Sequence, residues 1–143
     1  MKVAVNNNCG RKLDVKALKN ACLRVMRAEG VRKDAVLSLS AMDEEEMGKL
    51  NRRYLRGDGS TDVIAFCMGE DCEQGYLMGD VIICPQVILE NKRQYDVDEA
   101  RVLEYVAAHG VLHILGYEDD EEKDWEEMDR KQREILGLPG ERR

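Results

Sequence analysis

The sequence predicts one α/β domain, in which a mixed sheet of about four strands has helices packed against it. Its length of 143 residues corresponds to one domain. Apolar residues make up 43% of the chain and charged residues 36%, a balance typical of a folded protein rather than a disordered one. The patterns along the chain follow the order β-α-β-α-β-β-α-α-α, which favours a mixed sheet covered by helices. We therefore expect residues 1–143 to form a single domain.

The first half of the chain alternates between strand and helix patterns. Residues 2–5 and 35–41 have the apolar and alternating character of strands. Between them, Asp14 can cap a helix whose apolar residues recur at helical spacing until Gly30. A second, short helix is predicted over residues 43–54, because an Asp at the N-cap is followed by three Glu that suit the helix dipole.

Two further strands and a helix start are predicted in the middle of the chain. Residues 57–60 have turn composition, and the β-favouring residues 61–67 follow them. A connection rich in Gly, Glu and Asp then leads to a fourth strand at residues 77–84. Pro85 follows that strand and suits the first position of a helix, where no amide donor is needed.

Two helices are predicted at the C-terminal end. Asp96 or Asp98 can cap the longest apolar helix, and Gly116 ends it. The last helix is predicted from about Glu122 to Leu136 and is polar on most of its surface. Its exception is a stripe formed by Trp125, Met128, Gln132 and Ile135.

The charge is uneven along the chain. The net charge is −7, and residues 118–129 hold nine acids against one lysine, so the remainder of the chain is close to neutral. An acidic chain argues against non-specific binding of duplex DNA. The simplest interpretation of the acidic run is a helix start with a solvated face. One local basic cluster stands out as a candidate for contact with nucleic-acid phosphates, with a solvated helix end as the alternative: Lys49, Arg52, Arg53 and Arg56.

Cysteine use and the lack of apolar runs indicate the compartment. The five cysteines are an odd number without a CxxC pair, which favours reduced thiols over a disulfide framework. Cys67 and Cys72 are better explained as packing or loop thiols than as zinc ligands. The start Met1–Val5 lacks the apolar core of a signal peptide, and no run is long enough to span a membrane. We therefore expect a cytoplasmic protein that does not bind membranes.

The most informative stretch contains both histidines of the chain. A spacing of four residues places His109 and His113 on one face of a helix, close enough to bind one ion. Gly116 can adopt a left-handed conformation that reverses the chain, which brings Asp119 back toward the imidazoles. Three protein ligands with a position left open are typical of a catalytic zinc site.

The alternative is that these are ordinary helix residues followed by a solvated acidic turn. Their place near the end of the most apolar helix argues against it, because an unpaired imidazole there would need a partner. The glycine and the carboxylate also fall at the spacing of the extended zincin pattern. Gly110 stands where zincin proteases have their general base, so peptidase activity is disfavoured. Hydrolysis of a phosphodiester does not require that glutamate.

The motif resembles the signature H-G-x-L-H-L-x-G-Y-D-H of the YbeY family, bacterial endoribonucleases that mature ribosomal RNA and act on single strands. Two upstream blocks are also similar to the family, in the family's order. Residues 50–66 resemble L-N-x-x-Y-R-G-x-D-x-P-T-D-V-L-S-F, and Gly79–Pro85 resembles G-D-[IV]-x-I-C-P. The resemblance extends from about Leu50 to Asp120.

The resemblance implies a zincin-like fold, one zinc ion per chain, and a role in 16S rRNA 3′-end processing and ribosome quality control. Single-stranded RNA, the ribosome and ribosomal proteins are the implied partners. We predict His109, His113 and Asp119 as metal ligands, and Arg56, His109 and His113 as catalytic residues. Asp119 stands where the family has a third histidine, and Leu55 where it has a phosphate-contacting arginine, so that Arg56 would substitute one position later.

Other functions are consistent with the same residues. One alternative is a ribosome-assembly factor that binds rRNA through its basic cluster and uses zinc mainly for structure. Another is a hydrolase of a small phosphoester or amide. Asp62 and Asp80 would either orient metal ligands from a second layer or act as capping carboxylates at strand ends.

Overall fold

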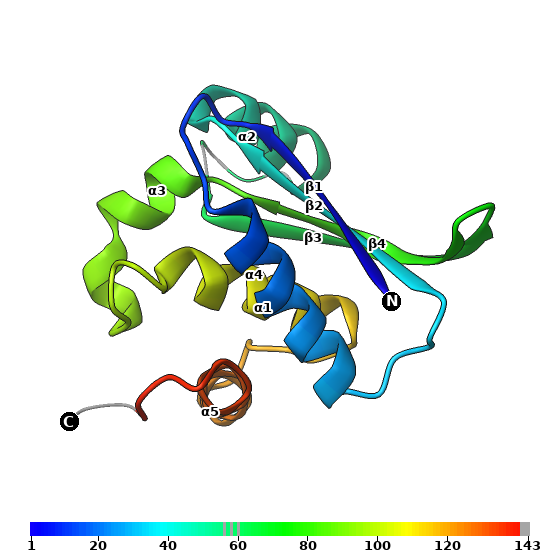
Figure 1. Ribbon diagram of the computed structural model, residues 1–143. Coiled ribbons are helices and arrows are strands. Elements are labelled where there is room, and N and C mark those ends of the chain that lie inside the picture. The colour runs from blue at the N-terminus through cyan, green and yellow to red at the C-terminus, as the bar shows by residue number, and fades with distance from the viewer. Residues whose placement is uncertain (56, 58, 60, 141–143) are drawn as a thin grey trace.

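The computed structural model describes residues 1–55, 57, 59 and 61–140, and these contain a four-stranded mixed sheet (Figure 1). In spatial order its strands are β1 (Lys2–Asn8), β2 (Ala35–Met42), β4 (Gly75–Ile83) and β3 (Val63–Cys72). β1, β2 and β4 run parallel, and β3 pairs antiparallel with β4 at one edge. The predicted fold class is confirmed.

The helices cover both faces of the sheet unequally (Figure 1). One face carries α1 (Val15–Ala28) and α4 (Val102–Ile114), and α5 (Glu122–Leu136) packs beneath these two helices as an outer layer. The other face carries only α2 (Glu44–Leu50), which continues as a π-helical segment, η1 (Asn51–Leu55). After β4 the chain forms α3 (Pro85–Glu90) and a 3₁₀ turn, η2 (Lys92–Tyr95). Among the described residues, no helix has the length and apolar character needed to cross a bilayer.

Two apolar cores correspond to the two faces of the sheet. The alternation of strand side chains explains this division, because neighbouring residues of a strand point to opposite faces. The larger core lies between the sheet and the pair α1 and α4; its buried members include Leu37, Leu39, Val81, Ile83, Val25, Met26, Val106 and Val111. The smaller core lies under α2 and consists of Met47, Ile64, Ile82 and Cys84.

The two N-caps predicted near the start of the chain are confirmed. The carboxylate of Asp14 accepts a hydrogen bond from the amide of Ala17 (3.0 Å), and that of Asp43 accepts from Glu46 (2.9 Å). The cap predicted for α4 is wrong. Arg101 is its N-cap residue, whereas Asp96 ends η2 in a left-handed conformation with φ 50°. Asp96 therefore belongs to the end of a short 3₁₀ turn. The periodicity of apolar residues does not distinguish such a turn from a loop, so the sequence did not reveal it.

The segment predicted as a connection between the third and fourth strands is mostly paired strand and forms a β-hairpin. β3 continues to Cys72 and β4 already begins at Gly75, with a shift in pairing between Cys67 and Glu70. These residues are exposed, so they lack the apolar alternation by which a half-buried strand is recognised in a sequence. The hairpin projects beyond the rest of the sheet in Figure 1.

Candidate metal centre

Helix α4 and the turn that follows it bring three predicted ligands together. Gly116 adopts φ 101°, and the chain reverses immediately after the helix. As a result, Nε2 of His109 lies 2.9 Å from Oδ2 of Asp119 and 3.0 Å from Nε2 of His113. Nε2 of His113 lies 3.3 Å from the same carboxylate oxygen. Two imidazoles and one carboxylate therefore converge on one point, as their spacing predicts.

Hydrogen bonds on the far side of each ring define which nitrogen carries the proton. Nδ1 of His113 lies 3.0 Å from the carbonyl oxygen of Tyr117, which can only accept, so Nδ1–H is the donor. Nδ1 of His109 lies 3.0 Å from Oε1 of Gln132. The amide of Gln132 is oriented by its own Nε2–H, which donates to the carbonyl of Tyr105 (3.0 Å). Both imidazoles therefore direct Nε2 toward Asp119, and in the Nδ1–H tautomer this nitrogen offers its lone pair to a cation.

This donor set fits a divalent cation. The two Nε2 atoms lie 3.0 Å apart, and in the Nδ1–H tautomer of both rings their lone pairs face each other. A cation between the lone pairs removes their repulsion. Ligand atoms about 2.0–2.2 Å from a tetrahedral zinc lie roughly 3.3–3.5 Å from one another, close to the distances here. Partners that hold the outer nitrogen of a histidine are also typical of metal-bound imidazoles.

The turn that carries Asp119 is held by residues from distant parts of the chain. The hydroxyl of Tyr117 donates to the carboxylate of Glu29, at the end of α1. Lys131 of α5 donates to the same carboxylate (3.3 Å) and lies 5.2 Å from the centre of the Tyr117 ring. These partners raise the pKa of Lys131, chiefly through its hydrogen bond to Tyr117 and further through Glu29, so that the lysine stays charged.

Gly110 lets α4 approach the sheet closely beside the first histidine. A Cβ atom at this position would lie 2.6 Å from Cγ1 of Val81 and 3.2 Å from Cγ2 of Val63. Glutamate, the residue that zincin proteases have here, would therefore collide with the sheet. The helix lacks a general base at this position because it packs where that side chain would stand.

The three side chains open into a cavity of about 450 Å³. The side chains of His109, His113 and Asp119 are 17%, 29% and 33% exposed, so the cluster is accessible to a ligand from this side. Asp62 lines the same cavity, where its Oδ2 accepts a hydrogen bond from the hydroxyl of Tyr95 (2.6 Å). Its Oδ1 accepts from the amide of Val63 (2.8 Å), so Asp62 also caps the start of β3.

Three other residues that the sequence analysis considered lie outside the cluster of His109, His113 and Asp119: Asp80, Cys67 and Cys72. Asp80 shares a strand face with Ile82, whose side chain is in the core under α2, so it points away from the metal ligands. Its buried Oδ1 has no hydrogen-bond partner among the described residues. Cys67 and Cys72 are exposed free thiols outside the cluster, and the thiol of Cys67 donates to the carbonyl of Ile114 (3.6 Å).

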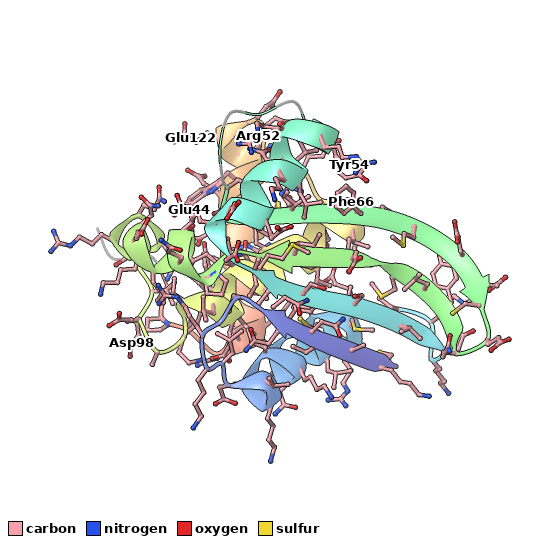
Figure 2. The ribbon with its side chains drawn as sticks, turned by 90° about the horizontal axis from the view of Figure 1, so that it is seen from above. Glu44, Arg52, Tyr54, Phe66, Asp98 and Glu122 are labelled. Atoms are coloured by element: carbon pink, nitrogen blue, oxygen red, sulfur yellow. The ribbon has the colours of Figure 1, made fainter. Side chains whose placement is uncertain are left out.

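The basic cluster is only partly described. Arg52 and Arg53 are exposed on η1, and the guanidinium of Arg53 lies 5.3 Å from the centre of the Tyr54 ring. Figure 2 shows Arg52 and Tyr54 on this segment, with Tyr54 next to Phe66 of β3. Arg56 lies outside the residues that the structure describes. Leu55, where the family has an arginine, is 53% exposed and lines a second groove together with His113.

Sequence reasoning did not assign two residues of the centre. Gln132 is fully buried, and its amide links His109 to the backbone of α4. Trp125, one turn from the start of α5, lines the cavity and is 39% exposed. Both residues belong to the predicted stripe of the last helix. A glutamine within an apolar stripe was the available signal, because a buried amide needs partners.

Comparison with known proteins places this geometry in a family. The family model described as endoribonuclease YbeY matches residues 4–138. The chain belongs to the YbeY family. The endoribonuclease YbeY of Pelotomaculum thermopropionicum is 37% identical over 125 residues, which cover 84% of this chain and 82% of the relative. That of Salinispora tropica is 32% identical over 148 residues and covers 95% of this chain and 94% of the relative.

A solved structure shows the same fold. The solution structure of TM1509 from Thermotoga maritima superposes with a TM-score of 0.60 and covers 98% of this chain and 99% of that one, at 23% sequence identity. Within the YbeY fold of this chain, the cluster of His109, His113 and Asp119 could hold a metal ion.

Proposed function

We propose that this chain is a metal-dependent endoribonuclease specific for single-stranded RNA, which acts in the cytoplasm in 16S rRNA 3′-end maturation and ribosome quality control. One observation carries the proposal: two imidazole Nε2 atoms and a carboxylate oxygen converge within 3.3 Å of each other at the wall of an open cavity. Membership of the YbeY family supports RNA as the substrate. Ribosomal proteins are the partners that such a role requires.

In this proposal His109, His113 and Asp119 hold one zinc ion per chain. When bound, the ion supplies Lewis acidity toward a phosphodiester oxygen or a water molecule. Gln132 and the Tyr117 carbonyl keep the protons on Nδ1, so that both Nε2 atoms stay available as ligands. Arg56 is proposed to stabilise the charge that develops on the phosphate, because a guanidinium offers paired donors to it.

The open wall of the cavity favours a catalytic site over a purely structural one. Structural zinc sites usually have four protein ligands, mainly thiolates, and are closed to solvent. Here three ligands converge, the described thiols lie elsewhere, and each ligand side chain is partly exposed. A position for substrate or water is therefore available on the cavity side.

The proposal is tested by metal content and by cleavage of single-stranded RNA in parallel. Untagged protein purified without chelators should contain about one zinc per chain and should cleave a single-stranded oligoribonucleotide but not the same sequence in a duplex. Removal of the metal with a chelator should abolish cleavage, and added zinc should restore it. Asp119→Ala should lose both the metal and at least 100-fold in cleavage rate.

The neighbouring carboxylate provides a matched control. Asp120 is exposed and lies outside the cluster, so Asp120→Ala should retain metal and activity. Full cleavage by folded His113→Ala protein would remove the metal from the mechanism. Stoichiometric zinc and RNA binding without any turnover would instead support the assembly factor whose zinc is structural.

A further inference from the structure

One wall of the cavity that contains the ligand cluster is aromatic. Its lining includes Tyr95, Tyr105 and Trp125, and Tyr105 lies one turn before His109 on the same face of α4. The two tyrosine rings meet edge to face, with centroids 6.1 Å apart. The volume of about 450 Å³ lies within the range of sites that bind small organic molecules. The cavity is large enough for one nucleoside.

The three aromatic residues differ in whether their ring is free to contact a ligand. Tyr95 donates its hydroxyl to Asp62, and Tyr105 donates to the buried carboxylate of Asp129, so both rings are fixed within the protein. Trp125 is 39% exposed, and its indole makes no ring or cation–π contact with any other described residue. An indole face is therefore available at the mouth of the cavity.

Helix geometry explains why Trp125 is exposed although the next two residues of its stripe are buried. Met128 and Gln132 lie on the same face of α5 and are 1% and 0% exposed, because α4 and α1 cover them. Trp125 lies one turn closer to the start of the helix and lines the cavity instead of the core. Exposed apolar area beside a ligand cluster is typical of a binding surface.

Charge determines which part of a nucleotide suits this end of the cavity. Glu122 and Asp124 are in the first turn of α5, and Asp120 and the N-cap residue Glu121 precede it. Figure 2 shows Glu122 among the surface side chains. These carboxylates repel a phosphate beside the indole but do not repel a neutral base.

A second groove adjoins the cavity, and among its described lining residues Glu118 is the one carboxylate. This groove shares Val63, Ala65 and His113 with the cavity and continues to Leu55, the last residue of η1. Arg52 and Arg53 are exposed on that segment. A strand whose base lies at the indole can therefore follow this groove past His113 toward the segment that carries the two arginines.

On these grounds we propose that Trp125 is a base-stacking residue, on which one unpaired base of the RNA substrate stacks beside the metal ligands. The proposal rests on the proposed function for the identity of the substrate. Stacking needs an exposed base face, which a duplex does not offer, so Trp125 also contributes to selection of single strands. Purines should stack better than pyrimidines, because they cover more of the indole.

The single tryptophan of the chain makes the proposal testable by fluorescence. The wild-type protein is titrated with a 2′-O-methyl octa-adenylate, which lacks the 2′-hydroxyl, and with the same backbone carrying abasic positions. We expect the adenylate to quench the indole emission and the abasic strand not to. Equal quenching by both strands would overturn the proposal.

Affinity and kinetics of Trp125 variants provide the second measurement. We expect Trp125→Ala to weaken adenylate binding by about 5- to 150-fold and Trp125→Phe to retain most of it, measured with a labelled strand. Cleavage by Trp125→Ala should show a raised KM with kcat nearly unchanged. Met68→Ala, which truncates another exposed apolar side chain outside the cavity, should behave as wild type.

The outcomes separate this inference from the proposed function. Unchanged binding and KM in a folded Trp125→Ala protein that still cleaves RNA would overturn the stacking role and leave the nuclease intact. Base-dependent quenching in a protein without cleavage would support the stacking role and contradict the proposed function.

Discussion

The buried amide of Gln132 determines which nitrogen of His109 is available to a cation. Its Oε1 accepts from Nδ1–H, and its Nε2–H donates to the carbonyl of Tyr105, so the amide cannot rotate without losing both bonds. Asp119 already contributes a negative charge where the family signature has a third histidine. A neutral glutamine behind His109 fixes the proton without adding another charge.

Substitution of Gln132 should weaken metal binding without removal of any ligand. Gln132→Ala leaves Nδ1–H of His109 unpaired, and we expect the zinc affinity to fall by about 10- to 100-fold. Gln132→Glu keeps an acceptor for Nδ1–H but loses the donor to the Tyr105 carbonyl, so it should restore only part of the affinity. Competition with a chromophoric chelator measures both values.

Gln86 supplies the control for this substitution. It lies on α3, and its amide donates to Glu90 only. Gln86→Ala should retain the affinity of the wild type. If Gln132→Ala bound zinc as tightly as Gln86→Ala, with both proteins folded, the positioning role of the amide would be wrong.

At the scale of elements, Gly110 sets the distance between α4 and the sheet. The Cα of this residue faces Val81 of β4 and Val63 of β3, and both proposed ligand histidines lie on the same helix. Strands β3 and β4 are therefore in direct contact with the helix that carries the ligands. Because this contact fixes the height of α4 above the sheet, it also fixes the ligands relative to the cavity wall.

Gly110→Ala should destabilise the fold even though alanine favours helix. The new methyl group would lie 2.6 Å from Cγ1 of Val81, so α4 or the strand must move. We expect a loss of about 1–3 kcal/mol in the free energy of unfolding, as for other overpacked cores. Urea denaturation measures this value.

A double-mutant cycle identifies the cause of that loss. Val81→Ala makes room for the new methyl group, so the effect of Gly110→Ala should be smaller in that background. Equal losses in both backgrounds would show that contact with Val81 is not the reason for the glycine.

The elements that the sequence predicts well are those with a buried apolar face. Asp14 and Asp43 cap their helices as their side-chain chemistry predicts, because an N-cap bond is local. The outer part of the β3–β4 hairpin was not predicted, since both of its faces are solvated and no apolar alternation marks it. Asp96 and Asp98 were predicted to cap α4, but a turn at residues 99–101 separates them from the helix, and Arg101 is the N-cap residue.

The same distinction applies to the candidate centre. Local spacing alone brings His109, His113 and Asp119 together, since one helix and one turn contain all three. Gln132 and Trp125 reach the centre only through the packing of α5 against α4, which no local pattern specifies. The helical spacing of Gln132 and Trp125 predicted that both lie on the less polar face of the last helix. It did not predict which residues this face contacts.

At the scale of the whole molecule, buried groups that must stay neutral limit its stability in alkali. Burial raises the pKa of the Cys22 thiol from 9.0 to about 12. Burial also raises the pKa of the Tyr105 hydroxyl, and the hydrogen bond to Asp129 raises it further. In the unfolded chain both groups lose their protons at lower pH than in the folded protein.

The free energy of unfolding should therefore decrease as the pH rises above about 9. The contribution of Cys22 is fully present below pH 9 and is lost between pH 9 and about 12, by at most about 1.4 kcal/mol per pH unit. Cys22→Ala should lower stability at neutral pH and reduce the slope above pH 9. Cys72→Ala, which removes an exposed thiol, should keep the slope. Identical slopes in Cys22→Ala and wild type would contradict this assignment.

The contacts of α5 have a consequence for the order in which the centre is completed during synthesis. Every ligand side chain has been made once residue 119 is in place, but the amide behind His109 and the lysine beside Tyr117 come from residues 131 and 132. A nascent chain that ends before α5 thus has the chelating atoms without the supports that orient them. In the proposed function, the affinity for the cation would therefore reach its full value only after translation of the last helix.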